Sequence, residues 1–129
     1  MPYGQFVLFD STFVGFIPVR DLDSAQEFYC GVLGLRALER SPVAVVVDTG
    51  SGTVRLTAVP EFRPQPFTVA GWLVSDMSST VAALAEAGVS MQRYEGMVQD
   101  ERGVWTAPSG DRVAWFTDPD GNVLSVTAH

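Results

Sequence analysis

Few side chains in this sequence are suited to catalysis or to metal binding. The only imidazole belongs to His129, the last residue, and the only thiol belongs to Cys30, within a helical pattern. Zinc, iron and nickel sites depend on imidazole, thiolate and carboxylate donors, and nucleophilic triads need a histidine held beside the nucleophile. We therefore expect no conventional transition-metal site, no Ser-His-Asp or Cys-His triad, and no cofactor.

Acidic side chains gather in the second half of the chain, at Glu95, Asp100, Glu101 and Asp111. Such a group has two interpretations, an oxygen-only magnesium or calcium site or a solvated acidic loop. No calcium-loop spacing accompanies these residues, which favours the solvated loop.

The bulk composition limits the class of protein. A chain of 129 residues that is 47% hydrophobic suits one domain with a substantial core. The formal net charge of −7, with eight scattered basic residues, argues against nucleic acid as a partner. No apolar run approaches the ~20 residues that span a bilayer, and Met1–Gly4 does not resemble a signal peptide. We expect a cytoplasmic protein without a membrane partner, and the single cysteine agrees with a reducing compartment.

The chain repeats itself once. Residues 16–22 precede a helical pattern that ends at Gly34, and residues 71–77 precede one that ends at Gly88. Two similar halves predict two similar modules within one domain of residues 1–129. The first module covers about residues 10–60, the second about 67–129, and the proline-rich residues 60–66 form the linker.

Each half reads as a βαβββ unit. The opening strands show period-two alternation, at Phe13, Ile17 and Val19 and at Ala70, Trp72 and Val74. Asp23 and Gln26 predict a capping box for the first helix, and Asp76 or Ser78 caps the second helix, which Gly88 ends. Further strands are expected at 36–39, 43–48 and 53–59, then at 91–94, 112–117 and 123–127, with a short strand at 104–106.

Several motifs together resemble one known superfamily. They are Val-x-Asp-Leu ending at Leu22, Phe28-Tyr29, Leu33-Gly34-Leu35, and Phe116-x-Asp-Pro-Asp-Gly-Asn ending at Asn122. This pattern is similar to the vicinal oxygen chelate superfamily, which includes glyoxalases, bleomycin-resistance proteins and extradiol dioxygenases. The resemblance implies an α+β fold in which paired βαβββ modules form a curled mixed sheet around a cup, with helices on the convex face. Homodimers are common in the family, so we expect a homodimer.

The two faces of each strand follow from the alternation of side chains. The set expected in the core is Phe13, Ile17, Val19, Leu56, Ala70, Trp72, Val74, Ala114, Phe116, Leu124 and Val126. The set expected to line the cup is Val14, Phe16, Arg55, Thr57, Val69, Leu73, Trp115, Thr117 and Ser125.

The resemblance also implies four metal-ligand positions, where relatives hold a divalent ion with His, Gln or Glu. In this sequence they fall on Val14, Thr57, Val69 and Ser125. None of these side chains is a strong ligand for a transition metal, so we expect the metal site of the family to be missing.

Aromatic and apolar side chains dominate the predicted cup. Phe16 and Trp115, joined by Trp105 and Tyr94, could sandwich a flat or hydrophobic ligand, although Trp105 could instead fill the core or a dimer interface. Arg55 either meets a ligand anion or is a surface arginine on an edge strand. The candidate ligand-binding residues are thus Phe16, Arg55, Thr57, Val69, Leu73, Trp105, Trp115, Thr117 and Ser125.

Residues 94–105 form a polar segment at the place where family members often carry a lid. Gln99, Asp100 and Glu101 could donate or accept hydrogen bonds or supply a general base, or they could belong to an ordinary exposed loop.

Two functions fit the sequence. The first is a metal-independent protein that binds or sequesters an aromatic or amphipathic small molecule, as in the bleomycin-resistance branch. The alternative is a lyase, isomerase or dioxygenase-like enzyme of the superfamily with a non-standard metal site or with metal-free acid-base chemistry.

Overall fold

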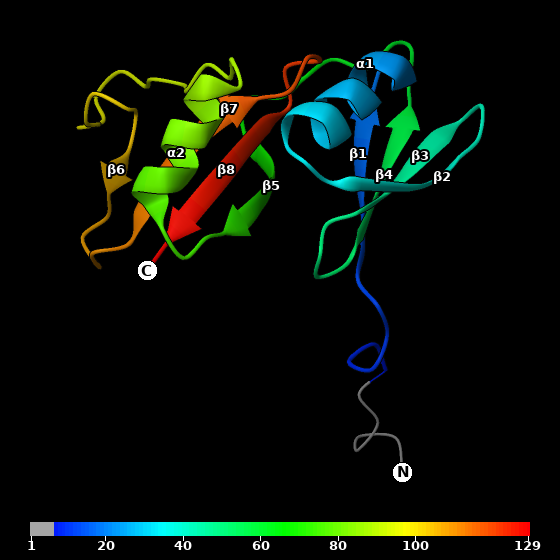
Figure 1. Cartoon of the computed structure of the whole chain (residues 1–129), viewed down its shortest axis with the longest axis horizontal. Coiled ribbons are helices and arrows are strands. Elements are labelled where there is room, and N and C mark those ends of the chain that lie inside the picture. Colours follow the sequence, from blue (N-terminus) through cyan, green and yellow to red (C-terminus); the bar gives the residue numbers. More distant parts are fainter. Residues whose placement is uncertain (1–6) are drawn as a thin grey trace.

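The computed structural model describes residues 7–129, which form two βαβββ modules (Figure 1). The first module contains β1 (Val14–Val19), α1 (Leu22–Gln26), the π-helical turn η2 (Glu27–Val32), β2 (Arg36–Arg40), β3 (Ala44–Asp48) and β4 (Thr53–Ala58). The second contains β5 (Thr68–Leu73), α2 (Met77–Glu86), β6 (Trp105–Thr106), β7 (Arg112–Thr117) and β8 (Val123–Ala128).

Each module builds one four-stranded mixed sheet. The strand orders are β1-β4-β3-β2 and β5-β8-β7-β6, with one parallel pair in each sheet, β1 with β4 and β5 with β8. Figure 1 shows the two sheets side by side, each with its helix lying across one face. This arrangement confirms the predicted α+β fold of paired modules with open, curled sheets.

The core lies between the helices and the sheet faces that they cover. Seven of the predicted core side chains are buried, namely Ile17, Val19, Leu56, Ala114, Phe116, Leu124 and Val126. The remaining second-module residues, Ala70, Trp72 and Val74, are partly buried against this core. The alternation of apolar residues therefore identified the covered face of the sheets.

The prediction for Phe13 is wrong, because its side chain is 77% exposed. The alternation reaches Phe13, but β1 begins only at Val14. Residues 7–12 lead away from the sheets (Figure 1), so Phe13 has no helix above it.

The caps of the helices differ from the prediction in the first module only. Asp21, not Asp23, is the N-cap of α1, and its carboxylate accepts hydrogen bonds from the Asp23 N–H and the Ser24 hydroxyl. The capping box at Asp23 is therefore wrong. Of the two predicted caps of α2, the structure uses Asp76 and not Ser78, and Gly88 follows that helix with φ +88°.

The strand predicted at 91–94 is also wrong. Met91 makes a single bridge to Phe116, and the chain then leaves the sheet because the Tyr94 N–H bonds the side chain of Gln99. Within residues 7–129, no helix combines the length and the apolar character needed to cross a lipid bilayer.

A buried polar network, here called the latch, joins the modules through the turn between β7 and β8. The Tyr29 hydroxyl on η2 donates to Asp118 Oδ2 at 2.7 Å. Asn122 Nδ2 donates to the same oxygen at 2.9 Å and to the Pro18 carbonyl of β1 at 2.8 Å. Burial, and next the negative charge of Asp118, raise the pKa of Tyr29 far above its usual value, so this hydroxyl keeps its proton.

Arg20 completes the latch on the surface side. Its backbone N–H and its Nε both lie 3.1 Å from Asp120 Oδ1, and its guanidinium also donates to the Asp120 and Phe62 carbonyls. Since Phe62 lies in the linker, one arginine ties β1, the linker and the second module together.

Candidate functional site

The first sheet presents Phe16 and Arg55 on its open face, opposite to the face covered by α1. They are paired in the parallel ladder of β1 and β4, and Arg55 Cζ lies 6.0 Å from the centroid of the Phe16 ring. This is the range of a cation–π contact. β4 lies between β1 and β3, so the interpretation of Arg55 as an edge-strand residue is wrong. The nearby Thr57 hydroxyl donates to the Arg55 carbonyl at 3.3 Å.

The second sheet carries a group of three rings, here called the aromatic cluster, made by Tyr94, Trp105 and Trp115. Trp115 meets Tyr94 edge to face, with centroids 5.4 Å apart and planes at 86°, and meets Trp105 at 6.2 Å and 36°. The three rings come from the loop after α2, from β6 and from β7. Burial raises the pKa of Tyr94, so its phenol is neutral and can both donate and accept a hydrogen bond.

Ser125 lies beside the aromatic cluster, because it pairs with Trp115 across β7 and β8. On its other side it pairs with Gly71 of β5, and a Cβ atom at Gly71 would collide with the Ser125 Oγ. The hydroxyl of Ser125 therefore occupies the space that the glycine leaves free. Thr117 stands two residues beyond Trp115 on β7 and is half-buried.

Two further predicted residues lie on β5 and are exposed, Val69 at 37% and Leu73 at 65%. Val69 shares a cavity of about 360 Å³ with Phe16 at the seam between β1 and β5. The hairpin that joins β3 and β4 forms another wall of this seam cavity.

The structure thus divides the predicted site residues into two groups on two sheets. Phe16, Arg55 and Thr57 form one group, and Trp105, Trp115, Thr117 and Ser125 form the other. In the part of the chain from residue 7 to 129, Trp115 has ring contacts with Tyr94 and Trp105 and not with Phe16. A ligand held by both Phe16 and Trp115 would have to bridge the two groups.

The residues at the four family ligand positions do not fit a transition-metal ion. Val14 and Val69 have no donor atom, and Thr57 and Ser125 offer only neutral hydroxyl groups. Residues 7–129 also hold no group of three or more His, Cys, Asp or Glu side chains arranged to hold a metal.

The acidic residues of the second module make local contacts. Asp111 Oδ1 lies 3.1 Å from His129 Nδ1, and Asp100 Oδ1 accepts from the backbone N–H groups of Arg102 and Val104 at 2.9 Å. Asp100 therefore shapes its own loop.

Gln99 has a similar role in the segment predicted as a lid. Its Nε2 donates to the carbonyls of Gln92 and Gly103, and its Oε1 accepts from the Tyr94 N–H at 2.7 Å. These bonds fix Tyr94 at the edge of the aromatic cluster, so Gln99 acts on the site through Tyr94.

Sequence reasoning missed Gly71 as a residue of this face. A glycine inside a strand pattern often marks a place where another group approaches closely, and that signal was available.

Comparison with known proteins agrees with this geometry. A family model of the Glyoxalase/Bleomycin resistance protein/Dioxygenase superfamily matches residues 9–126. The chain belongs to this superfamily. Among proteins with curated descriptions, none matches the chain significantly.

Solved structures show the same fold. A glyoxalase/bleomycin resistance protein/dioxygenase from Alicyclobacillus acidocaldarius is 19% identical with a TM-score of 0.70, covering 93% of this chain and 92% of that one. An integron cassette protein from the mobile metagenome of the Halifax Harbour sewage outfall is 26% identical with a TM-score of 0.69. The match covers 93% of this chain and 99% of that one. Lactoylglutathione lyase from Agrobacterium tumefaciens is 16% identical with a TM-score of 0.71. The match covers 92% of this chain and 93% of that one.

Proposed function

We propose that this protein binds an aromatic or amphipathic small molecule without the help of a metal ion. The observation that carries the proposal is the aromatic cluster on the open face of the second sheet. Its rings offer a large apolar surface together with polar edges, the Tyr94 hydroxyl and the indole N–H groups. The non-ligating side chains at the four family positions support a binding mode that relies on ring contacts.

Arg55 gives the second polar feature of the proposed site. Its guanidinium lies over Phe16, and the ion pairs among residues 7–129 use other arginines. A guanidinium of this kind can bond a carboxylate or phosphate group of a ligand through two parallel N–H donors.

The proposal includes a homodimer in the cytoplasm. Phe16 is 66% exposed and Leu73 65% exposed, and Val14 and Val69 add to the apolar surface of the open faces. Exposed apolar patches of this kind are typical of surfaces that bind another molecule. A second copy of the chain docked on the open faces would cover these side chains.

The experiment combines metal analysis of the purified protein with tryptophan fluorescence during a screen of aromatic compounds. The screen uses the Trp72→Phe protein, because Trp72 packs against the core and lines the seam cavity, so its fluorescence would not report on the aromatic cluster alone. We expect compounds that quench fluorescence in the presence of a chelator, and we expect Trp115→Ala to abolish this quenching.

Two outcomes would overturn the proposal. One is a stoichiometric metal ion whose removal abolishes binding, which would favour the enzyme alternative. The other is quenching that persists unchanged in Trp115→Ala, which would place the ligand away from the aromatic cluster.

A further inference from the structure

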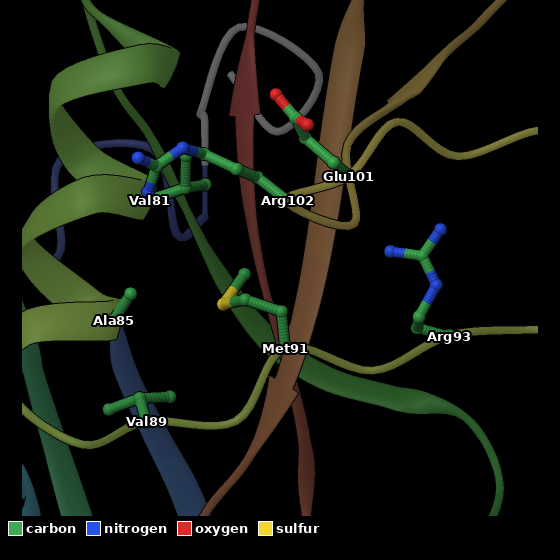
Figure 2. Close-up of a pocket in the computed structure, with 7 residues that line it drawn as sticks. All are labelled: Val81, Ala85, Val89, Met91, Arg93, Glu101 and Arg102. Atoms are coloured by element: carbon green, nitrogen blue, oxygen red, sulfur yellow. The ribbon is translucent and has the colours of Figure 1, made fainter.

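A second pocket lies between α2 and the loop of residues 91–103, and no aromatic-cluster residue lines it. Its volume is about 640 Å³, and its lining consists of Val81, Ala85, Val89, Met91, Arg93, Glu101 and Arg102 (Figure 2). This volume falls in the range of ordinary small-molecule sites. We refer to it as the helix-side pocket.

The floor of the helix-side pocket is apolar. Val81 of α2 is buried, and Val89 and Met91 are partly buried and contact the core. Ala85 lies one helical turn after Val81 and leaves open space because its side chain is small. An apolar group that entered here would leave water for a surface that is continuous with the core.

The loop that forms the other wall is fixed by its own hydrogen bonds. Gly103 has φ +87°, and a Cβ atom there would lie 3.2 Å from Met91 Cβ, so glycine allows the loop to close against the floor. Asp100 Oδ1 accepts a hydrogen bond from the Arg102 N–H at 2.9 Å. This bond fixes the backbone position of Arg102 and so the starting point of its side chain. The wall is therefore already formed in the free protein.

Two guanidinium groups stand at the rim. Arg93 donates to the Asp100 carbonyl at 2.8 Å and to the Gln99 carbonyl at 3.2 Å, which holds its position and leaves other N–H donors free. Figure 2 shows Arg102 extended toward α2 and Arg93 on the other side of Met91.

Neither rim arginine has a carboxylate partner. The arginine ion pairs among residues 7–129 belong to Arg20, Arg36 and Arg40, so Glu101 lines the same pocket without forming an ion pair with Arg93 or Arg102. Both arginines are exposed and stand next to the apolar floor, so their guanidinium groups can be reached by a ligand anion. An unpaired guanidinium is the group that best fits the two oxygens of a carboxylate.

From this arrangement we propose that the helix-side pocket binds an organic carboxylate, with its apolar body on Val81, Val89 and Met91 and its carboxylate at Arg102, the guanidinium that extends over this floor toward α2. This site is separate from the proposed site on the aromatic cluster, and the two proposals stand or fall independently.

The test is a titration of the full chain, followed by ¹H–¹⁵N NMR, with octanoate, octanol and octylammonium as probes of equal chain length. We expect octanoate to bind most tightly and to shift the amide signals of Val81, Ala85, Met91 and Arg102. The indole N–H signals of Trp105 and Trp115 should not move, because those rings lie outside the pocket.

Two pairs of variants separate charge at the pocket from charge elsewhere. Arg102→Gln should weaken octanoate binding about tenfold, since a charge-assisted hydrogen bond is lost, whereas Arg112→Gln at an exposed position of β7 should leave it unchanged. Ala85→Glu should also weaken binding by placing a negative charge in the pocket, whereas Ala83→Glu, on an exposed position outside the lining, should not.

The proposal is wrong if octanol and octylammonium bind as tightly as octanoate, or if each variant and its control change the affinity equally. The proposal is also wrong if octanoate shifts only the indole N–H signals, because the carboxylate would then bind at the aromatic cluster and not in the helix-side pocket. The ¹H–¹⁵N spectrum of each variant shows directly whether it is folded.

Discussion

The substitution Tyr29→Phe tests the latch, because it removes one hydroxyl group and leaves the ring in place. The lost hydrogen bond is 2.7 Å long, buried, and directed to Asp118. A hydrogen bond to a charged group contributes about 1.5–3 kcal/mol to stability. Asp118 Oδ2 keeps its bond from Asn122 Nδ2, so we expect a loss of about 2 kcal/mol, in the lower part of that range.

Thermal unfolding followed by circular dichroism measures this loss. For a chain of 129 residues, a change of about 2 kcal/mol lowers Tm by about 7 °C. Tyr94→Phe is the matched control, because the Tyr94 hydroxyl makes no hydrogen bond within residues 7–129 and its loss should cost less than about 0.5 kcal/mol.

The pH dependence gives a second test, of the burial of the Tyr29 hydroxyl beside Asp118. Burial raises the pKa of Tyr29 in the folded state above the ordinary tyrosine value of about 10. Above pH 10 the unfolded chain loses this proton while the folded chain keeps it, so stability is present below pH 10 and falls as the pH rises. The slope should be steeper in the parent protein than in Tyr29→Phe by up to about 1.4 kcal/mol per pH unit.

The chain is well suited to this measurement, because its basic residues are all arginine and no lysine titrates in the same range. Burial also raises the pKa of Cys30, but this contribution is the same in both proteins and cancels in the comparison. Equal alkaline slopes, or a Tyr29→Phe protein as stable as its parent, would refute the assigned role of this hydroxyl.

Three other predictions concern the strands and helices around the proposed sites. Gly71→Ala should destabilise the protein by about 1–3 kcal/mol in urea unfolding, and Ser125→Gly should recover part of this loss by making room for the new Cβ. Asp76→Ala should cost about 1 kcal/mol, because the Ser79 N–H at the start of α2 loses its acceptor; an unchanged urea midpoint would contradict that cap. Leu73→Asp should convert the proposed homodimer to a monomer in sedimentation velocity, and a parent protein that is already monomeric would refute the dimer.

The sequence predicted the modules and most strands because both depend on local patterns. Period-two alternation and the Asp76 cap involve residues close together in the chain, and they were confirmed. Phe13 shows the limit of the alternation, which does not reveal where the hydrogen-bonded ladder begins. The strand expected at 91–94 failed because one side chain, Gln99, takes the Tyr94 N–H that a strand would have used.

The candidate sites were harder to predict from the sequence, because they depend on contacts between residues that are distant in the chain. Tyr94, Trp105 and Trp115 lie together in the structure, but Phe16, which was predicted to join them, lies on the other sheet, and this division follows from strand order. The helix-side pocket needed the φ angle of Gly103 and the hydrogen bonds from the Arg93 guanidinium to the Asp100 and Gln99 carbonyls, neither of which a residue pattern specifies. The latch joins residues 89 to 104 positions apart, such as Tyr29 with Asp118 and Pro18 with Asn122.

The corresponding hairpin turns of the two modules are under different structural constraints. The turn between β7 and β8 carries the latch, whereas the turn between β3 and β4 closes on itself through bonds among Asp48, Thr49, Gly50 and Gly52. Added or altered residues at Ser51 would change a wall of the seam cavity without breaking a bond between modules. The earlier turn can therefore vary and reshape the seam cavity, while its counterpart must stay constant to keep the halves together.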